Sequence, residues 1–134
     1  MAIYIADDLK AAASQSRLAS MSARPSSLAL KLYDGTQPSA GGSVTNQTLL
    51  FSANLSNPIG SVSGHTLTLT LENSLNQVTA TGTPTWGRIV DHSGNWVLDA
   101  TAGVAGSGSV FVLDQVPIQQ GGYITAISMT ITEQ

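Results

Sequence analysis

The stretch TWGRIVDHSGNWVLDA, residues 85–100, carries two short runs of strand-forming side chains on either side of a polar turn. Aromatic, β-branched and aliphatic residues dominate residues 85–90 and 96–100, as is typical of strands. Residues 91–95 have the polar, Gly-containing composition of a tight connection. The stretch therefore predicts a β-hairpin.

Similar short runs continue along the chain on both sides of this hairpin. The clearest is at 65–71, where Leu67, Leu69 and Leu71 fall on one face and threonines on the other. Glycines, prolines and asparagines separate the runs. About eight strands in all predict an all-β fold, which is an antiparallel sandwich or jelly roll, or a barrel-like antiparallel sheet. The other predicted strands are residues 28–33, 48–53, 78–81, 109–113 and 123–132.

The N-terminal residues follow a different pattern. The Ala- and Ser-rich segment 8–23 predicts a short helix, because Ala11 to Ala13 favour helix and Pro25 ends it. We therefore divide the chain into an N-terminal arm and helix, residues 1–26, and an antiparallel β-domain, residues 27–134. An isolated helix this short is marginal in water, so it must pack against another surface.

The composition excludes several functional classes. The chain has 134 residues, no cysteine, 10% charged residues and a formal net charge of -3. It therefore lacks the broad basic field that nucleic-acid binding requires, and it cannot form disulfides, thiolate nucleophiles or Cys-bound zinc. No apolar run approaches the roughly 18–20 residues of a membrane helix. A β-surface with so little charge is prone to edge pairing, which indicates that its edges or faces are covered in an assembly.

Residues suited to catalysis or metal binding are few. His65 opens a predicted strand and His92 lies in the polar turn, and neither sits in a nucleophile elbow. We predict that both histidines are structural or solvent-exposed, that the chain is not an enzyme, and that it has no cofactor or metal. Asp91 and Asp99 flank the hairpin, where they either cap turns and stay solvated or form a weak cation site.

The hairpin also carries both tryptophans and the one basic residue of the β-region. Trp86 and Trp96 either fill the core or, on an exposed β-face, form a sugar-binding platform. Arg88 is two residues from Trp86 and so lies on the same face of its strand. We predict that Arg88 is buried or half-buried and pairs with Asp91, Asp99 or a backbone carbonyl. The residues predicted to be structural are Trp86, Arg88, Asp91, Trp96 and Asp99.

Three segments follow the Ala-rich helix in a fixed order: LKLYDGTQP at 30–38, ATGTPTWGRI at 80–89 and DHSGNWVLD at 91–99. This order resembles a family of small β-rich structural proteins of tailed bacteriophages and prophages. The family pattern reads helix, L-x-I-Y-x-G-T-x-P, then A-T-G-T-A-x-W-x-R-I-x-D-x-x-G-x-x-V-x-D-G. The resemblance runs from about residue 10 to the end. The chain departs from the pattern at Gly87, where a bulkier residue is common, and at Ala100, where Gly is common.

The resemblance implies a non-enzymatic virion structural protein. We expect a capsid cement or decoration protein that binds the major capsid protein or other virion proteins and stabilises the head shell. Such a protein occupies many equivalent sites, so we expect a homo-oligomer, a trimer or dimer, with no nucleic-acid or membrane partner. The alternatives are a head–tail connector or tail protein, and a carbohydrate-binding β-module.

The N-terminal arm is the predicted contact with a partner. Ile3, Tyr4 and Ile5 precede the helix and have no core of their own, and we expect them, with Leu9, to contact a neighbouring subunit or the shell. The first residues lack the basic segment of a secretory signal. The expected location is therefore the virion, assembled in the cytoplasm of the bacterial host.

Overall fold

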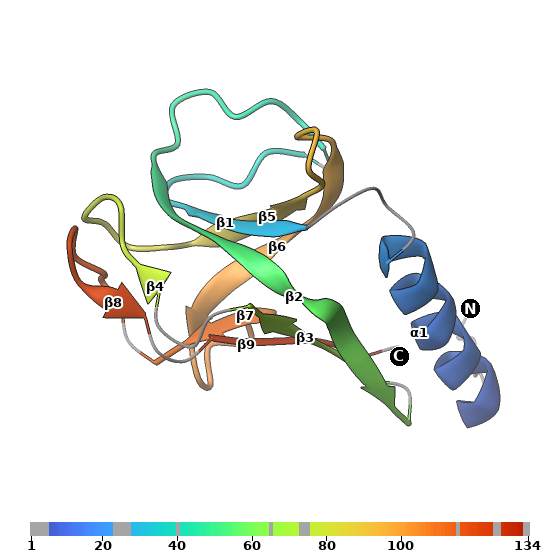
Figure 1. Ribbon diagram of the computed structural model, residues 1–134. Helices are drawn as coiled ribbons and strands as arrows, with labels where there is room; N and C mark the ends of the chain where they lie inside the picture. Colours follow the sequence, from blue (N-terminus) through green and yellow to red (C-terminus); the bar gives the residue numbers. More distant parts are fainter. Residues whose placement is uncertain are drawn as a thin grey trace.

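The structure is a computed structural model, shown in Figure 1. It describes residues 6–22, 28–39, 41–64, 66–72, 76–114, 116–124 and 127–132. Within them, helix α1 (Asp7–Ser22) is followed by β1 (Ala29–Tyr33), β2 (Leu49–Ser63), β3 (Thr66–Leu71), β4 (Asn76–Gln77), β5 (Trp86–Val90), β6 (Trp96–Val104), β7 (Phe111–Leu113), β8 (Tyr123–Ile124) and β9 (Ile127–Thr132). The predicted N-terminal helix and the predicted hairpin, β5–β6, are both confirmed.

Most of the described strands pair around a closed barrel in the order β1-β2-β3-β9-β7-β6-β5, and β4 pairs with β8 in a separate two-stranded sheet. The prediction of a mostly β chain with a short N-terminal helix is confirmed. Of the predicted arrangements, the strand order shows a barrel rather than a sandwich or jelly roll. The reason is that β1 pairs with both β2 and β5 and so closes the sheet on itself.

One pair departs from the predicted antiparallel domain, because β6 and β7 run parallel. A parallel pair normally needs a connection of about a dozen residues, which returns the chain along a whole strand. Here Ala102 pairs with Phe111 and Val104 with Leu113, so the chain returns by only two residues of strand, about 7 Å. The short connection makes this return with Gly106 and Gly108 at φ of 86° and 80°.

Several predicted strand boundaries are wrong; the strand predicted at 123–132, for example, forms β8 and β9, which belong to different sheets. Residues 78–81 are not a strand, because they cross over β2 with Thr79 N donating to Leu50 O at 2.9 Å. The strand predicted at 48–53 continues as β2 to Ser63, through Asn57 and Pro58. The β2–β3 register jumps between Leu55 and Gly60, so the proline lies where the ladder needs no N–H.

The barrel core lies between the strands and is filled by aliphatic and aromatic side chains. Leu30, Leu32, Phe51, Ile89 and Phe111 are all 0% exposed. The same core cluster includes Leu50, on the outer side of β2, and buried residues of the segments around β4 and β8. In the view of Figure 1 the two-stranded β4–β8 sheet and α1 lie on opposite sides of the barrel. The members of this part of the core are Leu50, Val78, Ile118 and Ile124.

Gly87 leaves the space that Phe111 fills. A Cβ at Gly87 would lie 2.8 Å from Phe111 Cδ2 and 3.0 Å from Leu32 Cδ2. Gly87 is also the cross-strand partner of Ala100 in the β5–β6 ladder. The two positions at which the chain departs from the phage-protein pattern are therefore direct neighbours in the barrel wall.

We expect Gly87→Val to lower the free energy of unfolding by about 1–3 kcal/mol, because the new methyl groups overpack the core against Phe111. Adding Phe111→Leu should restore part of that loss, since the two side chains compete for one space. Denaturant unfolding of both variants measures the two effects. Strictly additive losses in the double variant would contradict this account of the core.

Candidate functional site

The outer face of β5 is covered by residues 34–48, here called the cover loop, of which residue 40 lies outside the described part. Asp34 closes the base of this loop, because its Oδ1 accepts a hydrogen bond from Thr48 N at 2.6 Å. The indole Nε1 of Trp86 donates to Asp34 O at 3.0 Å. The loop explains why Trp86 is 0% exposed although it lies on the outer face of its strand.

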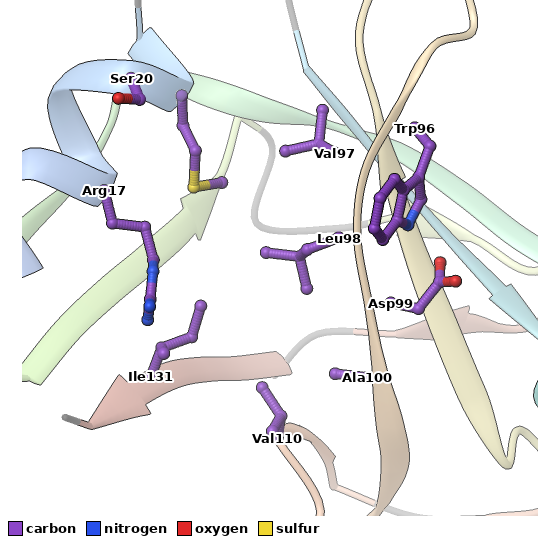
Figure 2. A pocket seen from close by; sticks show the side chains of 10 residues that line it. Arg17, Ser20, Trp96, Val97, Leu98, Asp99, Ala100, Val110 and Ile131 are labelled. Carbon is purple, nitrogen blue, oxygen red and sulfur yellow. The ribbon is translucent and has the colours of Figure 1, made fainter. Parts of the chain in front are cut away.

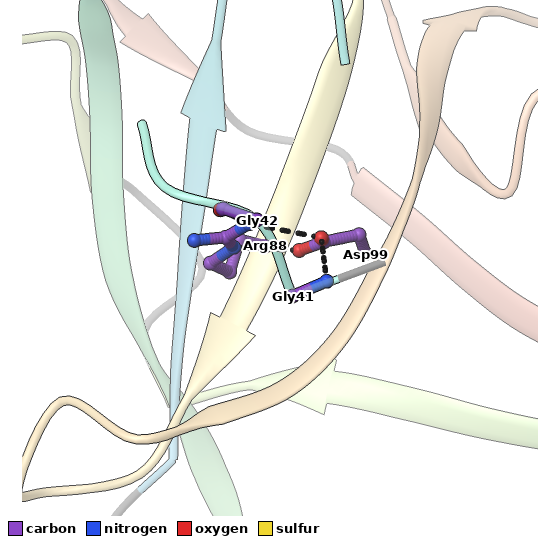
Figure 3. Close-up of polar contacts among 4 residues, drawn as sticks. All are labelled: Gly41, Gly42, Arg88 and Asp99. Carbon is purple, nitrogen blue, oxygen red and sulfur yellow. Dashed lines mark hydrogen bonds and ion pairs between the residues drawn. The ribbon is translucent and has the colours of Figure 1, made fainter. Parts of the chain in front are cut away.

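The middle of the cover loop is held by a buried ion pair between neighbouring strands, shown in Figure 3 and here called the latch. Arg88 on β5 donates to Asp99 on β6 from Nε to Oδ1 at 2.7 Å and from Nη2 to Oδ2 at 3.0 Å. Arg88 Nη2 also donates to Gly42 O at 2.7 Å, and Gly41 N donates to Asp99 Oδ2 at 3.3 Å. Both charged side chains of the latch thus hold the cover loop through hydrogen bonds to its main chain. Of the partners predicted for Arg88, the structure shows Asp99 and a backbone carbonyl.

An aromatic layer lies beside the latch. Trp86 stacks on Tyr33 of β1 with ring centroids 4.6 Å apart and an interplanar angle of 14°. Arg88 Cζ lies 5.4 Å from the centroid of the Trp86 ring, within cation–π range. The predicted placement of Trp86 and Arg88 on one face of their strand is confirmed. Trp86 fills space beneath the loop, so it is not part of an exposed sugar platform.

The burial of Tyr33 makes stability sensitive to alkaline pH. Burial raises the pKa of the Tyr33 hydroxyl above its ordinary value of 10.0, against an opposing effect of Arg88. The folded chain therefore holds this proton more tightly than the unfolded chain. The stability that comes from burying the neutral phenol is fully present below the pKa of Tyr33 in the unfolded chain. It is lost as the pH rises through the raised pKa of Tyr33 in the folded chain.

We expect Tyr33→Phe to lose less stability than the wild type as the pH is raised above about 10, because the buried phenol is gone. Tyr123→Phe is the matched control, because Tyr123 is 57% exposed on β8. Denaturant unfolding over a series of alkaline pH values compares the three proteins. Equal losses of stability in Tyr33→Phe and the wild type would contradict the assignment.

Asp91 caps the turn of the β5–β6 hairpin. Its Oδ1 accepts hydrogen bonds from Ser93 N at 3.0 Å and Asn95 N at 2.9 Å, and its Oδ2 accepts one from Asn95 Nδ2 at 3.3 Å. Asp91 is 5% exposed, so these bonds replace hydration of the carboxylate. Of the two interpretations of Asp91 and Asp99, turn capping holds for Asp91 and Asp99 belongs to the latch, but the expectation that they stay solvated is wrong, because the side chains of both are buried.

Trp96 lies at the surface, in contrast to Trp86. Its side chain is 43% exposed at the start of β6. The indole packs under Gly41 of the cover loop, where a Cβ would lie 3.0 Å from Trp96 Cε3. Gly41 also has a φ of +70°, so both its space and its backbone favour glycine. Trp96 therefore combines a contact with the loop and an exposed aromatic surface.

The remaining predicted residues are placed as follows. Leu9 is 60% exposed on α1, and its predicted contact with a partner stays a prediction. His92 is exposed in the hairpin turn. Ile3, Tyr4 and Ile5, the predicted partner-binding residues of the arm, and His65 lie outside the described residues.

The barrel closes through β7 along only part of β6, on the side of β6 that faces away from β5. β7 is short and pairs with residues 102–104 of β6 and 127–129 of β9. In the described part of the chain, residues 96–101 of β6 and 130–132 of β9 each have a strand partner on one side, β5 and β3. The edges between them offer main-chain N–H and C=O groups to a further strand. Because β7 fills this gap further along, the gap is about one strand wide.

The C-terminal half of α1 borders this gap, and Met21 enters the core with 5% of its surface exposed. A groove of about 510 Å³ remains between α1, β6 and β9, as Figure 2 shows; we call it the seam groove. Arg17 and Trp96 line opposite sides of the groove in this view. Its apolar lining consists of Met21, Val97, Leu98, Ala100, Val110 and Ile131.

Sequence reasoning missed the seam groove and the role of the cover loop in burying the outer face of β5, although residues 37–43 have the composition of a loop. The groove depends on which strands flank β7, and no local pattern encodes strand order. The loop left a weak signal in Gly41 and Gly42, which allow close approach of the backbone to other groups. The single basic residue of the β-region, Arg88, was the stronger signal for the latch.

No family model, no curated protein and no solved structure matches the chain. Among the described residues, no group of three or more His, Cys, Asp or Glu is placed to hold a metal ion. No described helix is long and apolar enough to cross a membrane. The function is therefore inferred from the geometry of the latch and the seam groove.

Proposed function

We propose that this chain is a non-enzymatic structural protein of a tailed-phage virion, a capsid cement or decoration protein that binds and stabilises the head shell. The observation that carries the proposal is the seam groove, in which two open strand edges flank an apolar lining. Main-chain pairing at such an edge gives affinity, and side chains that enter the groove give specificity. The groove thus suits assembly with another protein chain.

The residues of the phage-like motif support the same proposal through their structural roles. Trp86, Arg88 and Asp99 fix the cover loop, and Asp91 fixes the hairpin turn. The most distinctive polar groups of the hairpin therefore maintain the shape of a loop and a strand pair. A protein repeated over a shell requires such a fixed surface, because each copy must present the same contacts.

The proposal is tested with particles assembled without this chain. We expect them to release their DNA at a lower temperature than complete particles, and we expect purified protein added back to bind them and restore the release temperature. Binding is measured by co-sedimentation and release by dye fluorescence. Equal release temperatures together with no binding would overturn the proposal.

Carbohydrate binding is the second candidate, because Trp96 presents an aromatic surface that is 43% exposed beside the seam groove. Aromatic faces are common partners of apolar ligand surfaces. Glycan-array binding that is lost in Trp96→Ala would favour this candidate. For a cement protein we expect no glycan signal. A connector or tail protein is the further alternative, and its copy number per particle distinguishes it.

A further inference from the structure

We propose that the seam groove is filled by the segment Ile3-Tyr4-Ile5 of a second copy of this chain, which adds as a strand to the open edge of β6. The inference rests on the proposed function, because it names the partner that the groove would take in a homo-oligomeric building block. Residues 96–101 of β6 have β5 as their strand partner on one side. The added strand would pair with their main-chain groups on the other side.

The chemistry of the segment fits the groove. Ile3, Tyr4 and Ile5 are the β-branched and aromatic residue types that strands favour, and none carries a charge. In a strand, Ile3 and Ile5 would point to one face and Tyr4 to the other. The two isoleucines would then meet the apolar lining around Leu98, while the tyrosine would face the other side.

The length of α1 indicates that the segment comes from a second copy. The helix begins at Asp7, and its groove-lining residues Arg17 and Met21 follow ten and fourteen positions later, about 15–21 Å along the axis. Ile3 is four residues before Asp7 and reaches at most about 14 Å from it. The segment of the same chain is therefore too short to lie along the groove.

A second observation concerns the first turn of α1. If the arm binds a neighbouring copy, this turn lies next to that copy, because α1 begins at Asp7. Leu9 is 60% exposed and is among the large apolar side chains at the described surface. In an oligomer held together by the arm, Leu9 would pack against the neighbouring copy, and the Leu9 side chain would be removed from water. The same contact thus accounts for the open groove and for the exposed leucine.

The experiment measures the mass of the full chain by light scattering after gel filtration. We expect the wild type at a multiple of 13.8 kDa and Ile3→Asp/Ile5→Asp at 13.8 kDa, with the circular dichroism of a folded β-domain in both. Tyr123→Asp is the matched control, because it places a charge on an exposed aromatic residue of β8, on the other side of the barrel from α1; it should keep the wild-type mass.

Hydrogen exchange shows where the arm binds. We expect amides within residues 96–101 to exchange more slowly in the wild type than in Ile3→Asp/Ile5→Asp. A monomeric wild type, an oligomer that survives the arm variant, equal exchange at 96–101, or a small apolar molecule found in the groove by native mass spectrometry would each overturn the inference.

Particle binding by a monomeric wild type would overturn the inference alone and leave the proposed function standing. An arm-dependent oligomer that fails to bind particles would instead overturn the function.

Discussion

Replacing Arg88 with alanine is expected to lower the free energy of unfolding by about 3–5 kcal/mol, the usual cost of breaking a buried ion pair by removing one partner. The side chains of Arg88 and Asp99 are 11% and 3% exposed, so the remaining carboxylate would be buried without its cation. The change also removes the donor to Gly42 O and the cation that lies against Trp86. Denaturant unfolding monitored by tryptophan fluorescence measures the loss.

Lys31→Ala is the matched control for Arg88→Ala. Lys31 is the direct cross-strand partner of Arg88 in the β1–β5 ladder and is half-buried, so its removal deletes the same charge at a neighbouring position. We expect a loss of less than about 1 kcal/mol from it, as for most partly exposed charges. Asp99→Asn in the Arg88→Ala background should recover stability, because it removes the unpaired buried charge. Equal losses from Arg88→Ala and Lys31→Ala would contradict the structural role of the latch.

Replacing Trp86 with alanine is the second large expected effect, again about 3–5 kcal/mol. The indole is 0% exposed, stacks on Tyr33, and donates a hydrogen bond to Asp34 O at the base of the cover loop. Its removal would leave a cavity and an unsatisfied carbonyl beneath the loop. We therefore expect a lower midpoint of denaturation and faster amide exchange in the cover loop.

Two variants separate the contributions of Trp86. Trp86→Phe keeps an aromatic ring against Tyr33 and loses the Nε1 donor, so we expect a smaller loss, on the order of 1–2 kcal/mol. Trp96→Ala removes the other indole, which is 43% exposed, and should cost less than Trp86→Ala. If Trp96→Ala proved as costly as Trp86→Ala, the assignment of one tryptophan to the core and one to the surface would be contradicted.

The local part of the fold could be predicted from the sequence because it depends on local chemistry. The run from Thr66 to Leu71 alternates with period two and forms β3, and the polar turn at 91–95 joins β5 to β6. The prediction failed where a distant contact decided the outcome. Val78 to Thr81 have strand-forming side chains but cross β2 instead of extending a sheet, because they cover Leu50.

The candidate site divides in the same way. The role of Arg88 was predictable, because a lone basic residue beside a tryptophan in an apolar strand requires a partner. Its selection of Asp99 over Asp91 follows from the register of β5 and β6, which places Arg88 opposite Asp99. The seam groove was not predictable, since it arises where β7 is too short to complete the wall between β6 and β9.

The most direct test of the proposed function is the copy number of this chain in purified virions. Quantitative mass spectrometry with labelled peptides would compare it with the major capsid protein of the same particles. A cement or decoration protein predicts a ratio of one to one or another simple fraction of the shell lattice. Complete absence of the chain from the particles, or only a handful of copies in each, would contradict that role.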